Sequence, residues 1–327
     1  MGLPDENKNG YDSTSVLSWI DSMEGSLLLM HGVADDNVHL QHSNRFIQAA
    51  LKAKKNVRQI QVGEKPAGIA IDKKNKTIFV SNPESNNISK INLNKNTHEF
   101  FFAGNSPMSL NYSDSTKLLY VTNWYENKIS VVNTLNNNII KEINVGKSPA
   151  GLFLAEDIKK LFVANKDDNN ISIIDTNEFK KIKNVKVGKA PYGVFSSHMT
   201  EYIFITNVQS NSVSLINKKT LKVDKEIEVG KWPYQVVHNK KKQNIYVTNQ
   251  RDNSISVIDL KSKKVIKTIN DFCEYPEGID ISYNENLIVV ACWFEDNIIL
   301  MDLNNEKILK RIEVSGGPRS FGSFILN

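Results

Sequence analysis

Aromatic and cationic side chains gather at two kinds of position in this 327-residue sequence: around a recurring proline, and just after a recurring asparagine. The set comprises Trp124, Tyr125, Tyr192, Trp232, Tyr234, Arg251, Tyr275, Trp293 and Arg319. Trp, Tyr and Arg are the residue types that anchor ligands best, and loops on a rigid scaffold are where binding sites are built. We therefore predict a surface that binds a protein, peptide or glycan. The competing interpretation is that these rings only cap the apolar ends of strands.

Other kinds of chemistry have little support in the composition. The sequence holds six histidines and no C-x-x-C-H motif, so we predict no metal site and no cofactor. The net charge of +5 is spread evenly, which argues against nucleic acid as a partner. No apolar run approaches the ~20 residues that span a bilayer, so we expect no membrane insertion. The N-terminus lacks a basic segment followed by an apolar one, and thus no secretion signal is readable.

Proline spacing reveals an internal repeat. Seven of the nine prolines recur at intervals of 41 to 43 residues, namely Pro66, Pro107, Pro149, Pro191, Pro233, Pro276 and Pro318. About sixteen residues after a proline comes an aromatic-Val-Thr-Asn stretch such as Tyr246–Asn249, and then a stretch such as Ile255–Asp259. Alternating apolar and polar residues and β-branched enrichment indicate four short strands per repeat, A to D. A period of this length with four strands is typical of a β-propeller.

With these marks, residues 57–327 resemble the YVTN-family β-propellers. The family motif is spelled out in Tyr120–Asn123 and Tyr246–Asn249, and Val145–Pro149 and Val229–Pro233 match its Val-Gly-Lys-x-Pro segment. The resemblance implies a fold and no single shared chemistry. In such a fold the D–A and B–C loops share one rim, so we expect the aromatic and cationic set to lie together there.

The repeat count predicts an all-β, seven-bladed propeller with six complete blades and a split or incomplete seventh. The seventh proline implies an A strand from Arg319 to Leu326, without B and C strands after it. The run Val57–Val62 is interpreted as the D strand of that blade. Open strand edges are a liability that propellers avoid, so residues 1–56 are expected to fill the gap or to leave the blade incomplete.

Residues 1–55 do not follow the repeat, and we predict a boundary between a domain of residues 1–55 and a propeller of residues 56–327. Ser26–Met30 indicates a buried strand. Ser43–Lys54 indicates an amphipathic helix with Phe46, Ile47, Ala50 and Leu51 on one side. A strand, loop and helix in this order are typical of a short α/β segment.

This segment resembles part of the catalytic domain of the prolyl oligopeptidase (S9) family, especially its dipeptidyl peptidase IV-like members. Met1–Pro4, Gly10–Tyr11 and above all Leu27–His39 carry the resemblance. It implies that Asp35 is the acid of a Ser–Asp–His triad, that Asn37 contacts the substrate backbone and that Val38 walls a proline pocket.

The sequence departs from that family at the decisive residues. It contains no G-x-S-x-G elbow, and propeller repeats begin where the catalytic histidine is expected. We therefore predict a catalytically incomplete remnant, joined to the propeller near residue 55. The alternative is a serine-type peptidase fragment that takes its Ser and His from elsewhere. A second alternative aligns Leu27–Leu40 with Leu161–Ile173, which would make the segment a degenerate B–C pair closing the seventh blade.

The two cysteines both fall where the repeat has other residues. Cys273 replaces the Gly three positions before the proline, and Cys292 replaces the Asn that ends strand B. Facing Cα atoms on paired strands lie at a distance that a disulfide can span. We therefore predict a Cys273–Cys292 disulfide; the alternative is two independent buried thiols. A disulfide would place the propeller outside the cytoplasm, in the periplasm, at the cell surface or secreted.

Overall fold

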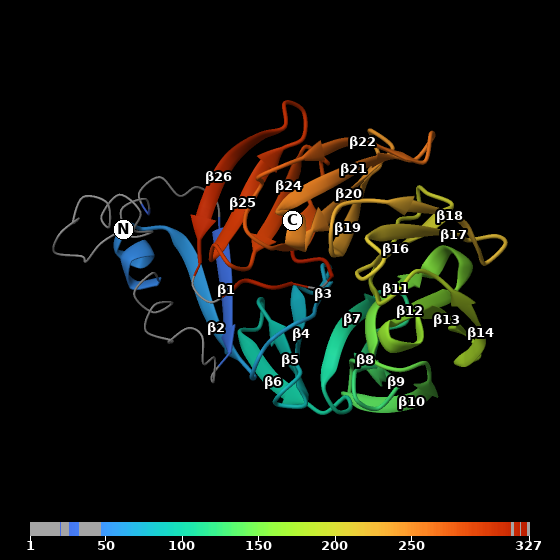
Figure 1. Ribbon diagram of the computed structural model, residues 1–327. Helices are drawn as coiled ribbons and strands as arrows, with labels where there is room; N and C mark the ends of the chain where they lie inside the picture. The colour runs from blue at the N-terminus through green and yellow to red at the C-terminus, as the bar shows by residue number, and fades with distance from the viewer. Residues whose placement is uncertain (1–19, 21–25, 33–46, 315–316, 321, 326–327) are drawn as a thin grey trace.

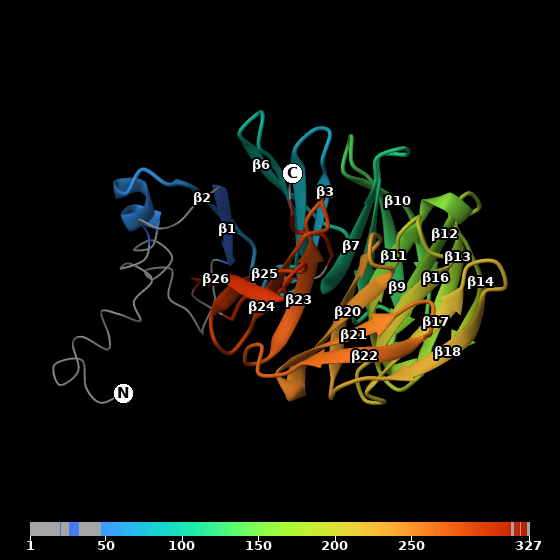
Figure 2. The ribbon, with the colours of Figure 1, turned by 90° about the horizontal axis from the view of Figure 1, so that it is seen from above.

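The computed structural model describes residue 20 and residues 26–32, 47–314, 317–320 and 322–325. Within these residues the chain forms six four-stranded antiparallel sheets and one two-stranded parallel sheet (Figure 1). The six sheets follow one another around a central axis as the blades of a propeller, with the N-terminal strand pair beside the first and last blades (Figures 1 and 2). No helix in this described part of the chain is long and apolar enough to cross a membrane.

Each blade runs from its innermost to its outermost strand in chain order. Blade 1 consists of β3 (Ile69–Asp72), β4 (Thr77–Asn82), β5 (Asn87–Asn92) and β6 (Thr97–Phe101). Blade 2 consists of β7 (Pro107–Ser113), β8 (Leu118–Asn123), β9 (Lys128–Asn133) and β10 (Asn138–Asn144). Blade 3 consists of β11 (Pro149–Ala155), β12 (Lys160–Asn165), β13 (Asn170–Asp175) and β14 (Lys180–Lys186). Blade 4 consists of β15 (Pro191–Phe195), β16 (Tyr202–Asn207), β17 (Ser212–Asn217) and β18 (Lys222–Glu228). Blade 5 consists of β19 (Pro233–Asn239), β20 (Asn244–Asn249), β21 (Ser254–Asp259) and β22 (Lys264–Ile269). Blade 6 consists of β23 (Pro276–Ile281), β24 (Leu287–Cys292), β25 (Asn297–Asp302) and β26 (Lys307–Glu313). Short 3-10 helices η2 (Glu156–Ile158), η3 (Lys166–Asp168) and η4 (Gln250–Asp252) lie in loops.

The core consists of layers between blades. The second strand of a blade is buried on both faces, so its apolar residues pack against the blade before and the blade after. Tyr120 of blade 2, for example, packs with Leu152 and Leu161 of blade 3. Similar layers join the other successive blades among the described residues. Burying one such side chain stabilises the fold by about 1.5–3 kcal/mol.

The expectation of seven blades is wrong, because the described chain forms six. Residues 317–320 and 322–325 follow the last blade and contain no strand. The run interpreted as the D strand of a seventh blade is instead β2 (Asn56–Val62), which pairs in parallel with β1 (Ser26–Gly32). A blade needs antiparallel neighbours linked by tight turns, whereas parallel strands need a longer crossover between them. The pairing therefore fits neither a D strand nor a degenerate B–C pair.

The described C-terminal residues, 317–320 and 322–325, lie beside the innermost strands of blades 6 and 1. Glycines in the first strands let the backbone of the next segment approach closely. A Cβ added to Gly151 of blade 3 would lie only 2.2 Å from Tyr192 O of blade 4. Likewise, a Cβ added to Gly278 of blade 6 would lie only 2.7 Å from Ser320 O of the C-terminal residues. The carboxylate of Asp280 accepts hydrogen bonds from Ser323 Oγ (3.0 Å) and from the backbone N–H groups of residues 324 and 325 (2.8 and 2.9 Å). This segment thus fills the inner side of the gap between the last and first blades.

The N-terminal strand pair packs against the open side of blade 1. Val62 of β2 is buried together with Ile78 and Val80 of β4, and Met30 of β1 packs against the same cluster. Residues 47–52 are helical, inside the predicted helix. Ala50 is buried against Ile20, but Leu51 is 56% exposed, so its predicted place on the apolar side is wrong.

A hydroxyl near the end of the second strand connects several blades to the next. Within blade 4, Thr206 Oγ1 accepts a hydrogen bond from Gly193 N (2.8 Å) and donates one to Tyr234 O of blade 5 (2.9 Å). Ser81, Thr122 and Thr248 make the same pair of bonds. The Thr of the repeat motif is therefore an interblade link, and it fixes the residue that follows the proline of the next blade.

We expect Thr206→Val to lower the free energy of unfolding by about 1–3 kcal/mol, because the isosteric valine leaves a buried N–H and a buried carbonyl without their partner. Urea unfolding followed by circular dichroism measures the loss. Thr220→Val, an exposed turn position of the same blade, is the matched control and is expected within about 0.5 kcal/mol of the wild type. Equal effects of the two substitutions would contradict the role of the hydroxyl as a link.

Candidate binding rim

We use "rim" for the D–A loops before each periodic proline and the B–C loops after each second strand. The residue before each periodic proline has a positive φ, which is unusual for side chains as bulky as Trp232 (φ 56°) and Tyr275 (φ 52°). The backbone N–H of each of these residues donates a hydrogen bond to an Asn of the preceding blade. Trp232 donates to Asn211 Oδ1 (3.1 Å), and Tyr275 donates to Asn253 Oδ1 (3.1 Å). The scaffold thus dictates where both rings lie.

The residue after each periodic proline forms a second set of seven equivalent positions. They are Ala67, Met108, Ala150, Tyr192, Tyr234, Glu277 and Arg319. The first five pack in one cluster together with Trp124 and Trp232. Because the first strands of successive blades lie side by side around the axis, these positions form a ring around the rim end of that axis, which we call the mouth ring. One part of this mouth ring is apolar, and the part from Tyr192 to Arg319 is polar.

The polar part of the mouth ring is connected from residue to residue. Tyr234 Oη donates a hydrogen bond to Tyr192 Oη (3.0 Å), and the two rings lie 4.5 Å apart. Trp124 meets Tyr192 edge-on at 6.4 Å. Burial raises the pKa of Tyr192 to about 12 and that of Tyr234 well above 10, so both hydroxyls stay protonated at neutral pH.

Glu277 is the buried acid of the mouth ring, only 1% exposed. Its carboxylate accepts a hydrogen bond from Gln250 Nε2 (2.5 Å) and lies 3.3 Å from Arg319 Nε. Burial raises the pKa of Glu277 to about 7, although Arg319 and Gln250 act in the opposite direction. The predicted ligand-binding set did not include Glu277 or Gln250, although the place of Glu277 directly after a periodic proline puts it on the rim.

The raised pKa of Glu277 predicts a pH dependence of stability. Between pH 4.5 and about 7 the folded chain binds more protons at this carboxyl than the unfolded chain, so stability falls as the pH rises through that window. Glu277→Gln should remove this loss, which is on the order of 3 kcal/mol. Thermal unfolding from pH 5 to pH 8 measures it. If the variant shows the same pH slope as the wild type, Glu277 does not titrate in this window.

The remaining predicted rim residues fall into a second cluster and one isolated ring. Tyr275 lies 6.0 Å from Trp293 and 4.2 Å from Phe294. The guanidinium of Arg319 lies over Trp293 at 3.9 Å, and that of Arg251 over Trp232 at 3.5 Å. Tyr125, in contrast, is 79% exposed and makes no ring contact with the other described aromatic residues. The structure thus places the predicted rim residues in two clusters, with Tyr125 apart from both.

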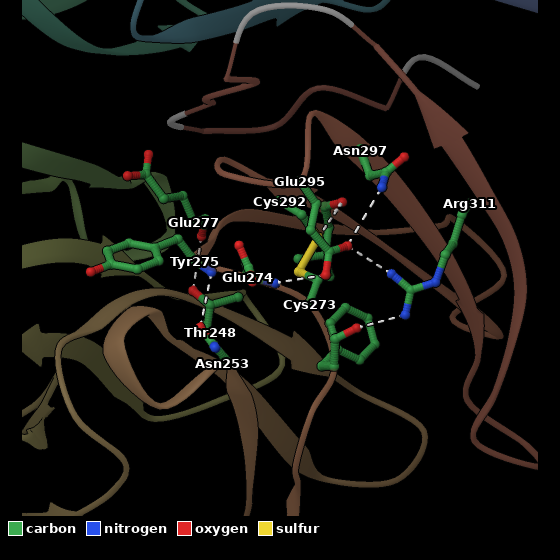
Figure 3. The surroundings of a disulfide bond; sticks show 12 residues. Thr248, Asn253, Cys273, Glu274, Tyr275, Glu277, Cys292, Glu295, Asn297 and Arg311 are labelled. Atoms are coloured by element: carbon green, nitrogen blue, oxygen red, sulfur yellow. Dashed lines mark hydrogen bonds and ion pairs between the residues drawn. A yellow bond between two sulfur atoms is a disulfide. The ribbon is translucent and has the colours of Figure 1, made fainter. Parts of the chain in front are cut away.

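Cys273 and Cys292 form a disulfide with their Cα atoms 6.0 Å apart, at the rim end of blade 6 (Figure 3). In the five other blades these two positions are a Gly and an Asn, and the Asn side chain fills the space that a Cβ on the Gly would need. The pairs are Gly63 with Asn82, Gly104 with Asn123, Gly146 with Asn165, Gly188 with Asn207 and Gly230 with Asn249. Each of these Asn side chains also donates to a Ser seven residues later, where blade 6 has Ile299. The disulfide thus replaces a buried Gly–Asn–Ser arrangement.

A hydrogen-bonded Ser–His pair lies away from the rim. Ser197 Oγ is 2.8 Å from His238 Nδ1, and His238 Nε2 is buried without a partner among the described residues. A nucleophilic serine needs a base with a pKa near neutrality and a third group that orients that base. Burial lowers the pKa of His238 to about 4, and no carboxylate in the described chain bonds its Nε2. The pair therefore has the wrong electrostatics for nucleophilic catalysis.

The residues singled out by the peptidase resemblance, Asp35, Asn37 and Val38, lie outside the described residues. Among the residues that the structure describes, no group of three or more His, Cys, Asp or Glu side chains is placed to hold a metal ion. The boundary expected between residues 55 and 56 stays a prediction.

Comparisons with known proteins match two parts of the chain to two families. Residues 52–160 match the YNCE-like beta-propeller family, and residues 1–70 match the prolyl oligopeptidase family. The inactive dipeptidyl peptidase 10 proteins of Rattus norvegicus and Mus musculus are each 41% identical to this chain over 54 residues, which is 16% of this chain. The match spans only 7% of the length of these relatives.

Solved structures support the propeller fold. Hydrazine synthase from Kuenenia stuttgartiensis superposes with a TM-score of 0.68 at 18% identity and covers 78% of this chain and 88% of that one. A functionally unknown protein from Desulfotomaculum acetoxidans DSM 771 superposes with a TM-score of 0.70 at 10% identity, covering 80% and 89%. At such identities the likeness concerns the fold alone. The described chain is a β-propeller, in part similar to YNCE-like propellers, and it carries an N-terminal segment similar to the prolyl oligopeptidase family.

Proposed function

We propose that this chain is a binding module without catalytic activity, and that its ligand binds the rim of the propeller. The observation that carries the proposal is the aromatic cluster at the rim end of the axis, where the half-buried Trp124, Tyr234 and Trp232 pack around the buried Tyr192. Each ring is fixed by neighbouring blades, so little conformational entropy is lost when a ligand binds. Rigid aromatic anchors of this kind are what protein and peptide ligands use.

The N-terminal resemblance to peptidases is compatible with a protein that has no catalytic activity. An Asp without its Ser and His has nothing to orient, and the chain contains no G-x-S-x-G elbow. The relatives matched by this segment are themselves named inactive dipeptidyl peptidases. We propose that residues 1–55 are a peptidase remnant, of which β1 now helps to cover the open side of blade 1.

An extracytoplasmic location, in the periplasm, at the cell surface or secreted, is part of the same proposal. The Cys273–Cys292 disulfide supports it, because structural disulfides persist in oxidising compartments and are rare in the cytoplasm of mesophiles.

Screening the purified chain against peptide and glycan arrays, followed by titration of the best ligands, tests the rim as the binding surface. Three of the four tryptophans are rim residues, so in a Trp19→Phe background the intrinsic fluorescence reports on the rim. We expect Tyr234→Ala to weaken binding by about tenfold or more, which corresponds to about 1.4 kcal/mol. The control is Tyr283→Ala, an 83% exposed aromatic on an A–B turn at the opposite end of blade 6. A failure to find any ligand, or ligands indifferent to Tyr234→Ala, would overturn the proposal.

A further inference from the structure

Arg251 is an exposed cation of the rim, stacked on Trp232, and its environment indicates the charge of the ligand. It lies in η4, and its backbone N–H donates to Lys231 O (3.2 Å). Its guanidinium carbon lies 3.5 Å from the centroid of the Trp232 ring, and its side chain is exposed. A guanidinium held this close to an indole ring is restrained by the cation–π contact, and its five N–H donors lie on an exposed side chain.

Arg251 differs in one respect from the other cations that lie over rim tryptophans. Arg319, over Trp293, is paired with Glu277, and Lys166, over Trp124, lies 3.6 Å from Asp167. Arg251 has neither an ion pair nor a side-chain hydrogen bond to any residue in the described part of the chain. Its orientation is therefore set in advance, while its hydrogen-bonding capacity is left for a ligand.

The loops around Arg251 reinforce a positive potential. Lys147, Lys189 and Lys231 occupy the same exposed position in the D–A loops that enter blades 3, 4 and 5. The acids of these loops are used internally: Asp168 and Asp252 accept the backbone N–H groups of Lys147 (2.9 Å) and Lys231 (2.6 Å). The lysine ammonium groups remain available to an anionic ligand.

These observations select among the classes of ligand. Sugars stack on open tryptophan faces, but all three described rim tryptophans have a cation over the ring. A nucleic-acid backbone repeats its charge along its length and needs a row of phosphate contacts, whereas Arg251 is a single guanidinium without an ion pair in the described chain. A peptide carboxylate needs one planar, bidentate partner, which is what Arg251 offers.

Resting on the proposed function of the rim, we propose that its ligand is an acidic peptide whose carboxylate pairs with the guanidinium of Arg251 while its neighbouring apolar side chains contact Trp232 and Tyr234.

Fluorescence anisotropy with a labelled peptide of alternating Glu and Leu residues tests this proposal. We expect the Glu peptide to bind, its Gln twin to bind at least tenfold more weakly, and Arg251→Gln to weaken binding of the Glu peptide by a similar factor. Lys263→Gln is the control, since Lys263 lies outside the rim and over a ring (Tyr202, 5.0 Å) but is already paired with Asp224 of β18.

Several results would overturn the acidic-peptide assignment: equal binding of the Glu and Gln peptides, no effect of Arg251→Gln, stronger binding of an oligothymidylate, or no binding of the Glu peptide up to about 1 mM. If Tyr234→Ala still abolishes binding of the array ligands in that case, the rim remains the binding surface and only its ligand class is wrong. If neither substitution affects any ligand, both proposals fail.

Discussion

Cys292→Ser is expected to lower the free energy of unfolding by about 3 kcal/mol, because it opens a loop of 18 residues between the bonded cysteines and leaves Cys273 with no partner. Reduction of the wild-type chain should have a similar effect. Denaturant unfolding with and without reductant measures both changes.

A matched variant separates the disulfide from the packing around it. Cys273→Gly, Cys292→Asn and Ile299→Ser together rebuild in blade 6 the Gly–Asn–Ser arrangement of the other blades. We expect this triple variant to be more stable than Cys292→Ser and insensitive to reductant, since the Asn fills the space above the Gly and donates to the Ser. A triple variant less stable than Cys292→Ser would show that blade 6 no longer accommodates the repeat arrangement.

Asp280→Ala is expected to lower the free energy of unfolding by about 3 kcal/mol or more. The Asp280 carboxylate is buried and accepts the hydroxyl of Ser323 and the backbone N–H groups of residues 324 and 325, so its removal leaves these donors unpaired. It also frees the C-terminal segment, which lies between the first strands of blades 6 and 1. Hydrogen exchange should therefore rise in β3 and β23 before it rises in β11.

Asp302→Ala in the same blade is the control for this prediction. Asp302 caps a surface turn by accepting the N–H of Asn304 (2.7 Å), and its loss is expected to cost about 1 kcal/mol or less. Similar losses for the two aspartates would mean that the C-terminal segment does not close the ring.

The repeat made most of the propeller predictable from the sequence. Strand positions follow from the spacing of Pro149 and Asn165 and their equivalents, because local β patterns and turns agree with the global fold. The gathering of Trp124, Tyr192 and Trp232 was likewise predictable, since residues at equivalent positions in a propeller must lie around one axis. The burial of Glu277 was not predictable, because the sequence pattern of an acid after a proline is that of a solvent-exposed turn residue.

The number of blades was not predictable in the same way. Pro318 carries the mark of a seventh repeat, but the described residues around and after it form no strand. The parallel pairing of β1 with β2 depends on the crossover between them, and the strand pattern of Val57–Val62 by itself does not distinguish a parallel from an antiparallel partner. Closure of the ring is a tertiary property, set by Asp280 and by the packing of Val62 against blade 1.

Intact-mass analysis of the purified chain after incubation with a fluorophosphonate tests most directly whether this protein is a binding module or a serine-type peptidase. Fluorophosphonates react with serines whose hydroxyl is activated by a base. The account predicts no adduct, because the sequence lacks the serine elbow and because His238, the base nearest to Ser197, has a pKa of about 4. A stoichiometric adduct on Ser197 or any other serine would contradict it.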